Sequence, residues 1–538
     1  MTFKLIKMKK QEETKLNTLS PFEVKDKLIQ LAKRRHDYAL INTGRGNPNW
    51  IATKPRDAFF QLGLFGLEES KRHLKELDGF GGISEKEGIT KRFEAYVVLN
   101  KNVIGLHYLN DLFQFASKTY SIDADGLMFE WVNGIIGNNY PVPGRMLTHS
   151  GTITRDYLMQ EMSAGSKPPK GKFDIFAVEG GTAAMVYIFN TLKINKFLKS
   201  GDTIAIGTPI FTPYFEMPEL KDYDLNLVLI KADENNNWQI PDSEIDKLKD
   251  SKVKAFFLVN PSNPPSVKLN DDTLNKIAKI AKERQDLILL TDDVYGSFTK
   301  NFTSLAMKAP ESTILVYSFS KYFGATGWRL GVIALHENNI FDKMLAKLPE
   351  EDKAELRERY CTISLKPDRI KMIDRFVADS RSVALNHTAG LSTPQQIQMS
   401  LFSLSTLIDL KNSYKTDVRN IVRNRYHKLF DNLPGEPLLS NDNENASYYY
   451  TLIDFLKLAE DKYDNNFSKW VSNNYNALDP VIRLAEEKAV IAMPGGGFDG
   501  PEWTIRFSLA NSYSEDFEKI SILINDILDE YHDVYQNK

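Results

Sequence analysis

The middle of the chain alternates short apolar runs with amphipathic segments. The runs are rich in β-branched and aromatic residues, and several are apolar on both alternating faces, as is typical of strands buried on both sides. Strands that alternate with helices predict an α/β fold with a mostly parallel central sheet and flanking helices. The predicted strands are residues 173–178, 203–207, 226–230, 254–259, 287–291, 313–318 and 330–334.

One connecting segment, residues 271–282, carries a clear helical pattern. Leu274 and Ile277 share one apolar face, while the opposite face is polar. Asn270 or Asp271 can cap its N-terminus. The pattern predicts a helix that crosses over between two parallel strands.

The C-terminal third has a different pattern. Residues 448–453, 490–493 and 504–509 resemble strands, and residues 515–531 form a strongly amphipathic final helix. This predicts a second, smaller α+β domain. Residues 51–135 are biased towards helix and rich in charge, as is a stretch near 337–380, and we interpret both as helical insertions.

These patterns predict a division of the chain into four parts. Residues 1–50 form an N-terminal arm and part of the small domain, and residues 51–135 form the first helical insertion. Residues 136–395 form the large domain, with the second insertion inside it, and residues 396–538 form the small C-terminal domain.

Composition and charge narrow the classes of function. The 538 residues are 42% hydrophobic and carry a formal net charge of −3, which removes the electrostatic argument for a nucleic-acid partner. The longest apolar runs, such as residues 255–259, are too short to cross a membrane. Cys361 is the single cysteine, so an internal disulfide is excluded. We predict a cytoplasmic protein with no membrane partner.

The most specific motif is the stretch Ser318 to Gly331, which directly follows a predicted strand. Its lysine, Lys321, lies at the carboxyl end of a parallel sheet, where open α/β folds bind ligands. Lysine can form a Schiff base with an aldehyde cofactor, and nearby hydroxyls together with Arg329 can hold a phosphate dianion. In isolation Lys321 would be a solvated loop residue, but this context predicts a pyridoxal-phosphate site.

A carboxylate follows the neighbouring strand. Asp292 and Asp293 close the strand at residues 287–291, and Tyr295 comes next in the same turn. A buried carboxylate can keep the nitrogen of a pyridine ring protonated, and a tyrosine nearby can donate to the ring oxygen. The alternative for Asp292 is a turn or a helix cap.

Three further segments carry weaker signals. Asn263 lies in a proline-rich turn after a strand, and Gly181 with Thr182 opens a helix whose amides can bind phosphate. Arg506 lies in a predicted strand of the small domain and can place a guanidinium near an acidic substrate. Each of these would be weak evidence by itself, and together they complete a cofactor site.

These residues, in this order, resemble the fold-type-I pyridoxal-phosphate enzymes of the aspartate aminotransferase superfamily. The resemblance covers most of the chain, and it implies that fold and pyridoxal 5'-phosphate as the cofactor. It implies that Lys321 forms the Schiff base and that Asp292 partners the ring nitrogen. Tyr295 and Asn263 would then donate to the ring oxygen.

The same resemblance implies roles for the remaining site residues. The substrate α-carboxylate would bind Arg506 and the backbone of Gly46. Tyr140 resembles the tyrosine that reaches the cofactor phosphate of a neighbouring subunit. The phosphate cradle would consist of Gly181, Thr182, Ser318, Ser320 and Arg329, with Phe211 stacked on the cofactor ring.

Within the superfamily, several motifs resemble the aspartate 4-decarboxylases, also called aspartate β-decarboxylases. These are residues 44–50, 139–145, 263–266 and 386–392. The third motif departs from the wider superfamily, because Pro265-Ser266 stands where Thr-Gly is usual. The long insertion before residue 140 also fits the decarboxylases better.

That resemblance implies a bifunctional enzyme. It would release L-alanine and carbon dioxide from L-aspartate and, more slowly, transaminate aspartate with 2-oxoglutarate or pyruvate as the amino acceptor. It also implies a homo-oligomer built from dimers, with a dodecamer as one assembly that the resemblance suggests.

The substrate β-carboxylate poses a separate physical requirement. A tight arginine pair would stabilise the charged ground state and oppose its conversion to neutral carbon dioxide. A decarboxylase should therefore hold this group less firmly than an aminotransferase does. Arg45, beside Gly46, is the candidate for a looser contact or a gate, and an ordinary surface-turn arginine is the alternative.

Two other functions fit parts of the pattern. One is an aspartate or aromatic aminotransferase without decarboxylase activity, which has the same cofactor site. The other is a transcriptional regulator that uses a degenerate cofactor domain as a sensor. About 43 residues precede Gly44, which is too few for a winged helix with a linker, so we disfavour the regulator.

Overall fold

The structure is a computed structural model that describes residues 16, 19, 21–34, 39–140, 144–383, 390–437, 439 and 443–538. Two of the motifs noted above therefore lie partly outside the described residues. These parts are residues 141–143 and residues 386–389.

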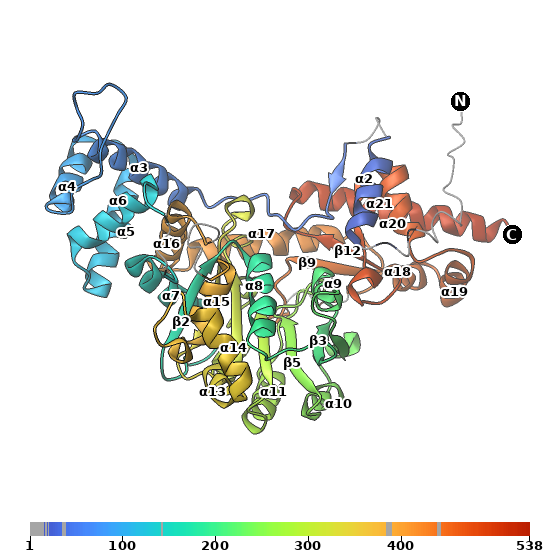
Figure 1. Cartoon of the computed structure of the whole chain (residues 1–538). Helices are drawn as coiled ribbons and strands as arrows, with labels where there is room; N and C mark the ends of the chain where they lie inside the picture. Colours follow the sequence, from blue (N-terminus) through green and yellow to red (C-terminus); the bar gives the residue numbers. More distant parts are fainter. Residues whose placement is uncertain are drawn as a thin grey trace.

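A seven-stranded sheet forms the centre of the large part of the chain (Figure 1). Its order is β2-β8-β7-β6-β5-β3-β4, and only β8 runs antiparallel to its neighbours. The prediction of a mostly parallel central sheet is confirmed. The strands are β2 (Phe173–Val178), β3 (Thr203–Thr208), β4 (Asn226–Lys231), β5 (Val253–Val259), β6 (Ile288–Asp292), β7 (Thr313–Ser318) and β8 (Gly331–His336).

Both faces of this sheet are buried, which explains the continuous apolar runs. In β5, Phe257 and Val259 belong to one hydrophobic cluster, while Phe256 and Leu258 belong to another on the opposite face. Alternating side chains therefore both lie in a core, and each strand is apolar throughout.

Helices cover these two faces (Figure 1). α11 has the N-cap that the sequence predicts, since the Asn270 side chain accepts a hydrogen bond of 2.8 Å from the Thr273 amide. The helices around the sheet are α8 (Gly181–Ile194), α9 (Pro213–Glu219), α10 (Asp242–Ile245), α11 (Asp271–Glu283), α12 (Leu305–Lys308), α13 (Ile340–Lys347), α14 (Glu350–Tyr360) and α15 (Met372–Ser380).

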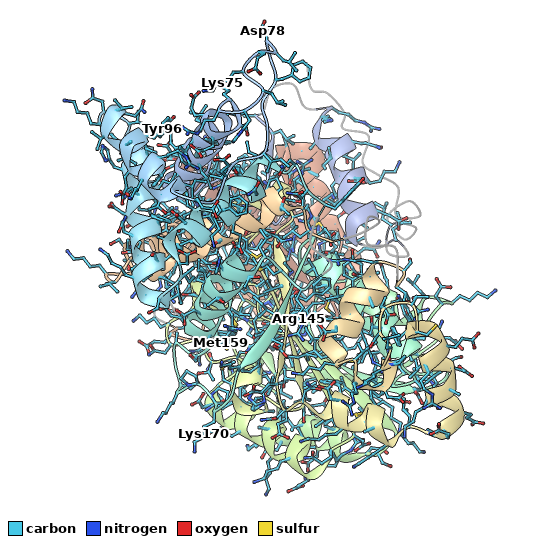
Figure 2. The ribbon with its side chains drawn as sticks, turned by 60° about the vertical axis from the view of Figure 1, so that its left-hand side comes forward. Lys75, Asp78, Tyr96, Arg145, Met159 and Lys170 are labelled. Carbon is cyan, nitrogen blue, oxygen red and sulfur yellow. The ribbon has the colours of Figure 1, made fainter. Side chains whose placement is uncertain are left out.

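A group of helices extends from one end of the large part (Figure 1), and the loop that carries Lys75 and Asp78 forms its tip (Figure 2). Its aromatic residues pack edge to face, with ring centroids 5.1 Å apart for Phe65 and Phe93 and 6.0 Å apart for Phe113 and Trp131. They belong to the same cluster as the sheet, so this segment shares the main core. The helices are α3 (Thr53–Ser70), α4 (Ile89–Leu99), α5 (Ile104–Tyr120), α6 (Ala124–Ile136) and α7 (Thr148–Met162).

The smaller part combines the C-terminal third with the start of the chain. A three-stranded antiparallel sheet has the order β11-β12-β9, and β1 pairs with β10 in parallel. A second hydrophobic cluster joins Val24 and Leu28 of α2 to the final helix. The elements are α2 (Pro21–Ala32), β1 (Ile41–Asn42), β9 (Tyr450–Asp454), α18 (Phe455–Lys462), α19 (Asn465–Asn474), α20 (Asp479–Lys488), β10 (Val490–Ile491), β11 (Met493–Pro494), β12 (Thr504–Ser508) and α21 (Ser514–Gln536).

Two helices connect these parts, α16 (Thr393–Leu407) and α17 (Ser413–Phe430). α16 packs on α3, α6 and α7, and its buried residues belong to the main core. In α17, Val418 belongs to the main core and Val422 to the cluster of the smaller part. We propose that the domain boundary falls within α17 rather than at residue 395.

A buried ion pair fixes α17 to the large part. Lys415 Nζ lies 2.5 Å from Glu161 Oε1, and both residues are buried. Two charges removed from water in this way depend on each other. The pair therefore ties the connecting helix to α7.

In the part of the chain that the structure describes, no helix is both long enough and apolar enough to cross a membrane.

We expect Lys415→Ala to lower the free energy of unfolding by about 3 kcal/mol, because it leaves the Glu161 carboxylate buried without its cation. Urea unfolding followed by circular dichroism measures this change. Lys428→Ala, which removes one half of an exposed pair with Glu518, is the matched control and should have no measurable effect. If both variants lowered the free energy of unfolding equally, the buried ion pair would not be what stabilises the connecting helix.

Candidate active site

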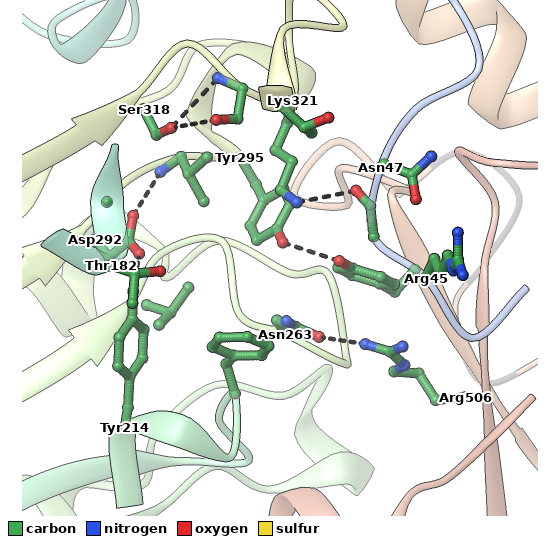
Figure 3. A pocket seen from close by; sticks show the side chains of 18 of the residues that line it. Arg45, Asn47, Thr182, Tyr214, Asn263, Asp292, Tyr295, Ser318, Lys321 and Arg506 are labelled. Carbon is green, nitrogen blue, oxygen red and sulfur yellow. Dashed lines mark hydrogen bonds between the residues drawn. The ribbon is translucent and has the colours of Figure 1, made fainter. Parts of the chain in front are cut away.

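A cavity of about 510 Å³ lies between the carboxyl edge of the large sheet and the smaller part (Figure 3). The strands β3, β5, β6 and β7 end at it, and β9, β12 and the segment after β1 close it from the other side. All the predicted site residues except Tyr140 line it. These are Arg45, Gly46, Gly181, Thr182, Phe211, Asn263, Asp292, Tyr295, Ser318, Ser320, Lys321, Arg329 and Arg506.

Lys321 lies in the turn after β7, and its amine reaches across the cavity. Nζ donates a hydrogen bond of 3.0 Å to the carbonyl oxygen of Gly46, which belongs to the segment after β1 (Figure 3). The same carbonyl accepts a hydrogen bond of 2.7 Å from the Tyr449 hydroxyl. The lysine amine is thus held where both parts of the chain meet.

Asp292 ends β6 with its carboxylate buried in the cavity wall. Oδ2 accepts a hydrogen bond of 2.7 Å from the Tyr214 hydroxyl, and Oδ1 accepts one of 3.2 Å from the Val294 amide. Burial raises the pKa of Asp292, and these two donors act in the opposite direction. The nearby Lys321 charge also lowers the pKa of Asp292, but among the described residues no lysine or arginine lies within ion-pair distance of it, so the carboxylate suits a cationic group of a ligand.

Arg506 in β12 is the opposite case, a buried cation. Its guanidinium carbon lies 4.5 Å from the ring centre of Tyr450 and 4.8 Å from that of Phe498, so two aromatic rings enclose it. One nitrogen donates to the Gly44 carbonyl at 2.8 Å and another to Asn263 Oδ1 at 3.4 Å. Burial lowers the pKa of Arg506.

No carboxylate of the described chain pairs with Arg506, and its Nε has no hydrogen-bond partner there. A buried guanidinium without an anion is costly unless a ligand supplies one. The site is therefore built to take a carboxylate from a bound molecule.

The other end of the cavity provides donors for a phosphate. α8 begins at Gly181, so its first amides point into the cavity. Gly180 precedes it with a φ of 87°, and a Cβ there would lie 2.5 Å from an Arg329 nitrogen, so only glycine fits. The Ser318 and Ser320 hydroxyls lie 2.9 Å apart beside these groups.

Arg45 and Tyr140 have different positions. Arg45 is exposed at the rim of the cavity, where it can contact a ligand loosely. Tyr140 is 70% exposed on the segment after α6 and does not line this cavity. A role for Tyr140 in a neighbouring subunit stays a prediction.

Two tyrosines that line the cavity, Tyr214 and Tyr450, carry no recognisable signal in the sequence. Tyr214 lies three positions after Phe211 and donates to Asp292, yet in the sequence it is one apolar position of a short helix. Tyr450 lies in a run of three tyrosines that predicts only a strand. No local signal distinguishes these hydroxyls, because their partners come from distant segments.

The arrangement fits pyridoxal 5'-phosphate. It offers donors for a phosphate at the start of α8, a carboxylate for a ring nitrogen, and a lysine amine between them. This combination defines a pyridoxal-phosphate enzyme that acts on a carboxylate substrate.

Comparison with known families agrees with this class. The model of the aminotransferase class I and II family matches residues 173–521. The chain belongs to the class I and II aminotransferases, and its cofactor is pyridoxal 5'-phosphate.

Two relatives illustrate the range of similarity. The chain is 48% identical over 525 residues to a Pseudomonas bifunctional aspartate aminotransferase and L-aspartate beta-decarboxylase, a match that covers 97% of this chain and 98% of that protein. It is 34% identical over 148 residues to an aspartate aminotransferase of Pyrococcus abyssi, which covers 27% of this chain and 37% of that protein. The resemblance predicted from the motifs is confirmed.

Solved structures show the same fold. A double mutant of the Thermus thermophilus aspartate aminotransferase superposes with a TM-score of 0.59 at 16% identity, covering 97% of this chain and all of that one. At this level of identity the likeness concerns the fold alone.

We expect Gly46→Ala to lower activity about 100-fold. A Cβ at residue 46 would lie 2.3 Å from the Tyr450 hydroxyl and 3.3 Å from Lys321 Nζ, so both groups must move. Steady-state kinetics with the cofactor-loaded enzyme measures the loss. Gly327→Ala, where a Cβ meets nothing within 4 Å, is the control that should keep full activity.

We expect Asp293→Asn to change how stability depends on pH. Asp293 is buried with Thr291 donating to it at 2.5 Å, and burial raises its pKa to about 7. Between about pH 4 and pH 7 the unfolded wild type loses this proton while the folded state keeps it, so rising pH destabilises the wild type. The free energy of unfolding of the variant, relative to that of the wild type, should therefore rise by at least about 1 kcal/mol from pH 5 to pH 8. Urea unfolding at both pH values measures this, and a constant difference would contradict it.

Proposed function

We propose that this protein decarboxylates L-aspartate at its β-carboxylate to give L-alanine and carbon dioxide, with transamination of aspartate as a second activity. The observation that carries the proposal is the 48% identity over 97% of the chain to the Pseudomonas bifunctional enzyme. The cavity supports it, because it has an acceptor site for a carboxylate at Arg506 and a lysine amine nearby.

The cofactor supplies an electron sink for bonds at the substrate α-carbon. In our proposal Lys321 binds its aldehyde group, and the start of α8 with Ser318, Ser320 and Arg329 binds its phosphate. Asp292 keeps the ring nitrogen protonated, since its buried carboxylate has no other cation within ion-pair distance among the described residues.

The chain's own residues then orient the substrate and move protons. Arg506 binds the α-carboxylate, held in orientation by the rings of Tyr450 and Phe498. Once the substrate amine has replaced it at the cofactor aldehyde carbon, the freed Lys321 Nζ, which lies beside Gly46 in the cavity, takes the proton from the α-carbon and returns one later.

We propose that the β-carboxylate lies toward the rim of the cavity, with Arg45 as its candidate contact. Arg45 is exposed at the rim, in contrast to the enclosed Arg506. A weakly held carboxylate can leave as neutral carbon dioxide without losing a strong ion pair. We propose that this difference between the two arginines favours decarboxylation over transamination.

We propose 2-oxoglutarate or pyruvate as the amino acceptor, a homo-oligomer of dimers in which Tyr140 reaches the neighbouring site, and a cytoplasmic location. The exposed position of Tyr140 next to a long helical segment supports the second of these.

Product analysis tests the proposal directly. Purified enzyme with pyridoxal 5'-phosphate, L-aspartate and 2-oxoglutarate as the amino acceptor should form alanine and carbon dioxide in equal amounts, and more alanine than oxaloacetate. Lys321→Ala should lose the visible absorbance of the bound cofactor and reduce the rate on the order of 1000-fold or more. Lys279→Ala, an exposed lysine of α11, is the matched control. If oxaloacetate forms without appreciable alanine, the decarboxylase proposal is wrong and the protein is an aspartate aminotransferase only.

A further inference from the structure

The departure at Ser266 has a structural counterpart in the cavity. Ser266 has a φ of 63°, in the left-handed region that glycine occupies more easily, and it is fully buried. Its hydroxyl accepts a hydrogen bond of 2.8 Å from the Tyr450 amide, and its carbonyl accepts one of 2.7 Å from the Ser447 amide. A glycine would relieve the backbone but could not hold the Tyr450 amide through a side chain.

The residue held in this way, Tyr450, reaches several groups of the site. Its hydroxyl lies 3.1 Å from the Tyr295 hydroxyl, and its ring lies against the Arg506 guanidinium at 4.5 Å. The Tyr450 hydroxyl and Lys321 Nζ both lie close to Gly46, since a Cβ there would be 2.3 Å from the first and 3.3 Å from the second. Tyr450 therefore lies between the carboxylate-binding arginine and Tyr295, while Asn263 contacts the same arginine from the side of the large sheet.

The direction of the hydrogen bond between the two tyrosines follows from the proposed cofactor contacts. Tyr295 has a single hydroxyl proton, and the resemblance assigns that proton to the cofactor ring oxygen. Its oxygen must then accept, so Tyr450 is the donor. The neighbouring Arg506 cation polarises the Tyr450 O–H bond and makes it a stronger donor.

We propose that Tyr450 is a positioning residue that couples the carboxylate site at Arg506 to the cofactor ring through Tyr295, and that Ser266 holds Tyr450 in place for this. The inference rests on the proposed function. An anion bound to Arg506 neutralises the cation beside Tyr450. Tyr450 then donates less strongly to Tyr295, and Tyr295 donates less strongly to the ring oxygen. Substrate binding therefore weakens the hydrogen bond to the cofactor ring oxygen before any bond of the substrate breaks.

The test follows the cofactor absorbance of the loaded enzyme as a function of pH, with and without succinate. Succinate is a dicarboxylate without an amino group, so it occupies the substrate site without reacting. In the wild type we expect succinate to move the pH midpoint of the absorbance change upward. When Tyr295 donates less strongly to the ring oxygen, that oxygen holds the neighbouring proton on the Lys321 nitrogen more firmly, so this nitrogen loses its proton at a higher pH. The Kd of succinate is measured by calorimetry on the same samples.

Tyr450→Phe keeps the ring against Arg506 and removes only the hydroxyl. We expect this variant to reduce the succinate-induced shift to less than about half of the wild-type value, while the Kd of succinate stays within about threefold. Ser266→Gly should reduce the shift, and relief of the positive φ offsets part of the stability that is lost with the hydrogen bond to the Tyr450 amide. Tyr426→Phe, which removes a buried hydroxyl bound to the Leu439 carbonyl outside the cavity, should behave as the wild type.

The outcomes separate the inference from the function it rests on. Wild-type shifts in both Tyr450→Phe and Ser266→Gly would overturn the coupling and leave the decarboxylase proposal intact. A wild-type enzyme with neither cofactor absorbance nor succinate binding would overturn the proposed function, and the coupling with it. A lower melting temperature and weaker cofactor binding in Tyr450→Phe, with an unchanged shift, would assign Tyr450 a structural role only.

Discussion

The site depends on two opposite charges that are buried in one cavity and do not neutralise each other. Asp292 ends a strand of the large sheet, and Arg506 lies in the small antiparallel sheet; each is less than a tenth exposed. Neither charge has an ion-pair partner among the described residues, and in the proposed function two ligand groups supply the partners, the cofactor ring nitrogen at Asp292 and the substrate carboxylate at Arg506. The rest of the fold holds these two groups at a fixed separation.

That separation requires a firm junction between the two parts of the chain. The connecting helix α17 contributes to both hydrophobic clusters, and its Lys415 is bound to the buried Glu161. At the cavity itself, the carbonyl of Gly46 joins Lys321 of the large part to Tyr449 of the smaller part. Polar contacts at the junction are therefore the same contacts that arrange the site.

The two arginines of the cavity differ in a way that bears on reaction choice. Arg506 is enclosed by aromatic rings, whereas Arg45 is exposed at the rim. In the proposed function the α-carboxylate binds at the first arginine and the β-carboxylate lies near the second, where it loses no strong ion pair when it departs as carbon dioxide. The same cofactor site can thus support transamination or decarboxylation, depending on how the second carboxylate is held.

The sequence by itself determined the sheet and most of the site. Continuous apolar runs require a sheet covered on both faces, and the carboxyl ends of its strands place Asp292, Lys321 and Gly181 at one edge because parallel strands end together. Only the tertiary structure decided the roles of Tyr214 and Tyr450. Their hydroxyls are defined by partners 78 and 155 positions away in the chain. No local pattern encodes such contacts, since an apolar position in a helix or strand looks the same whatever lies opposite its polar tip.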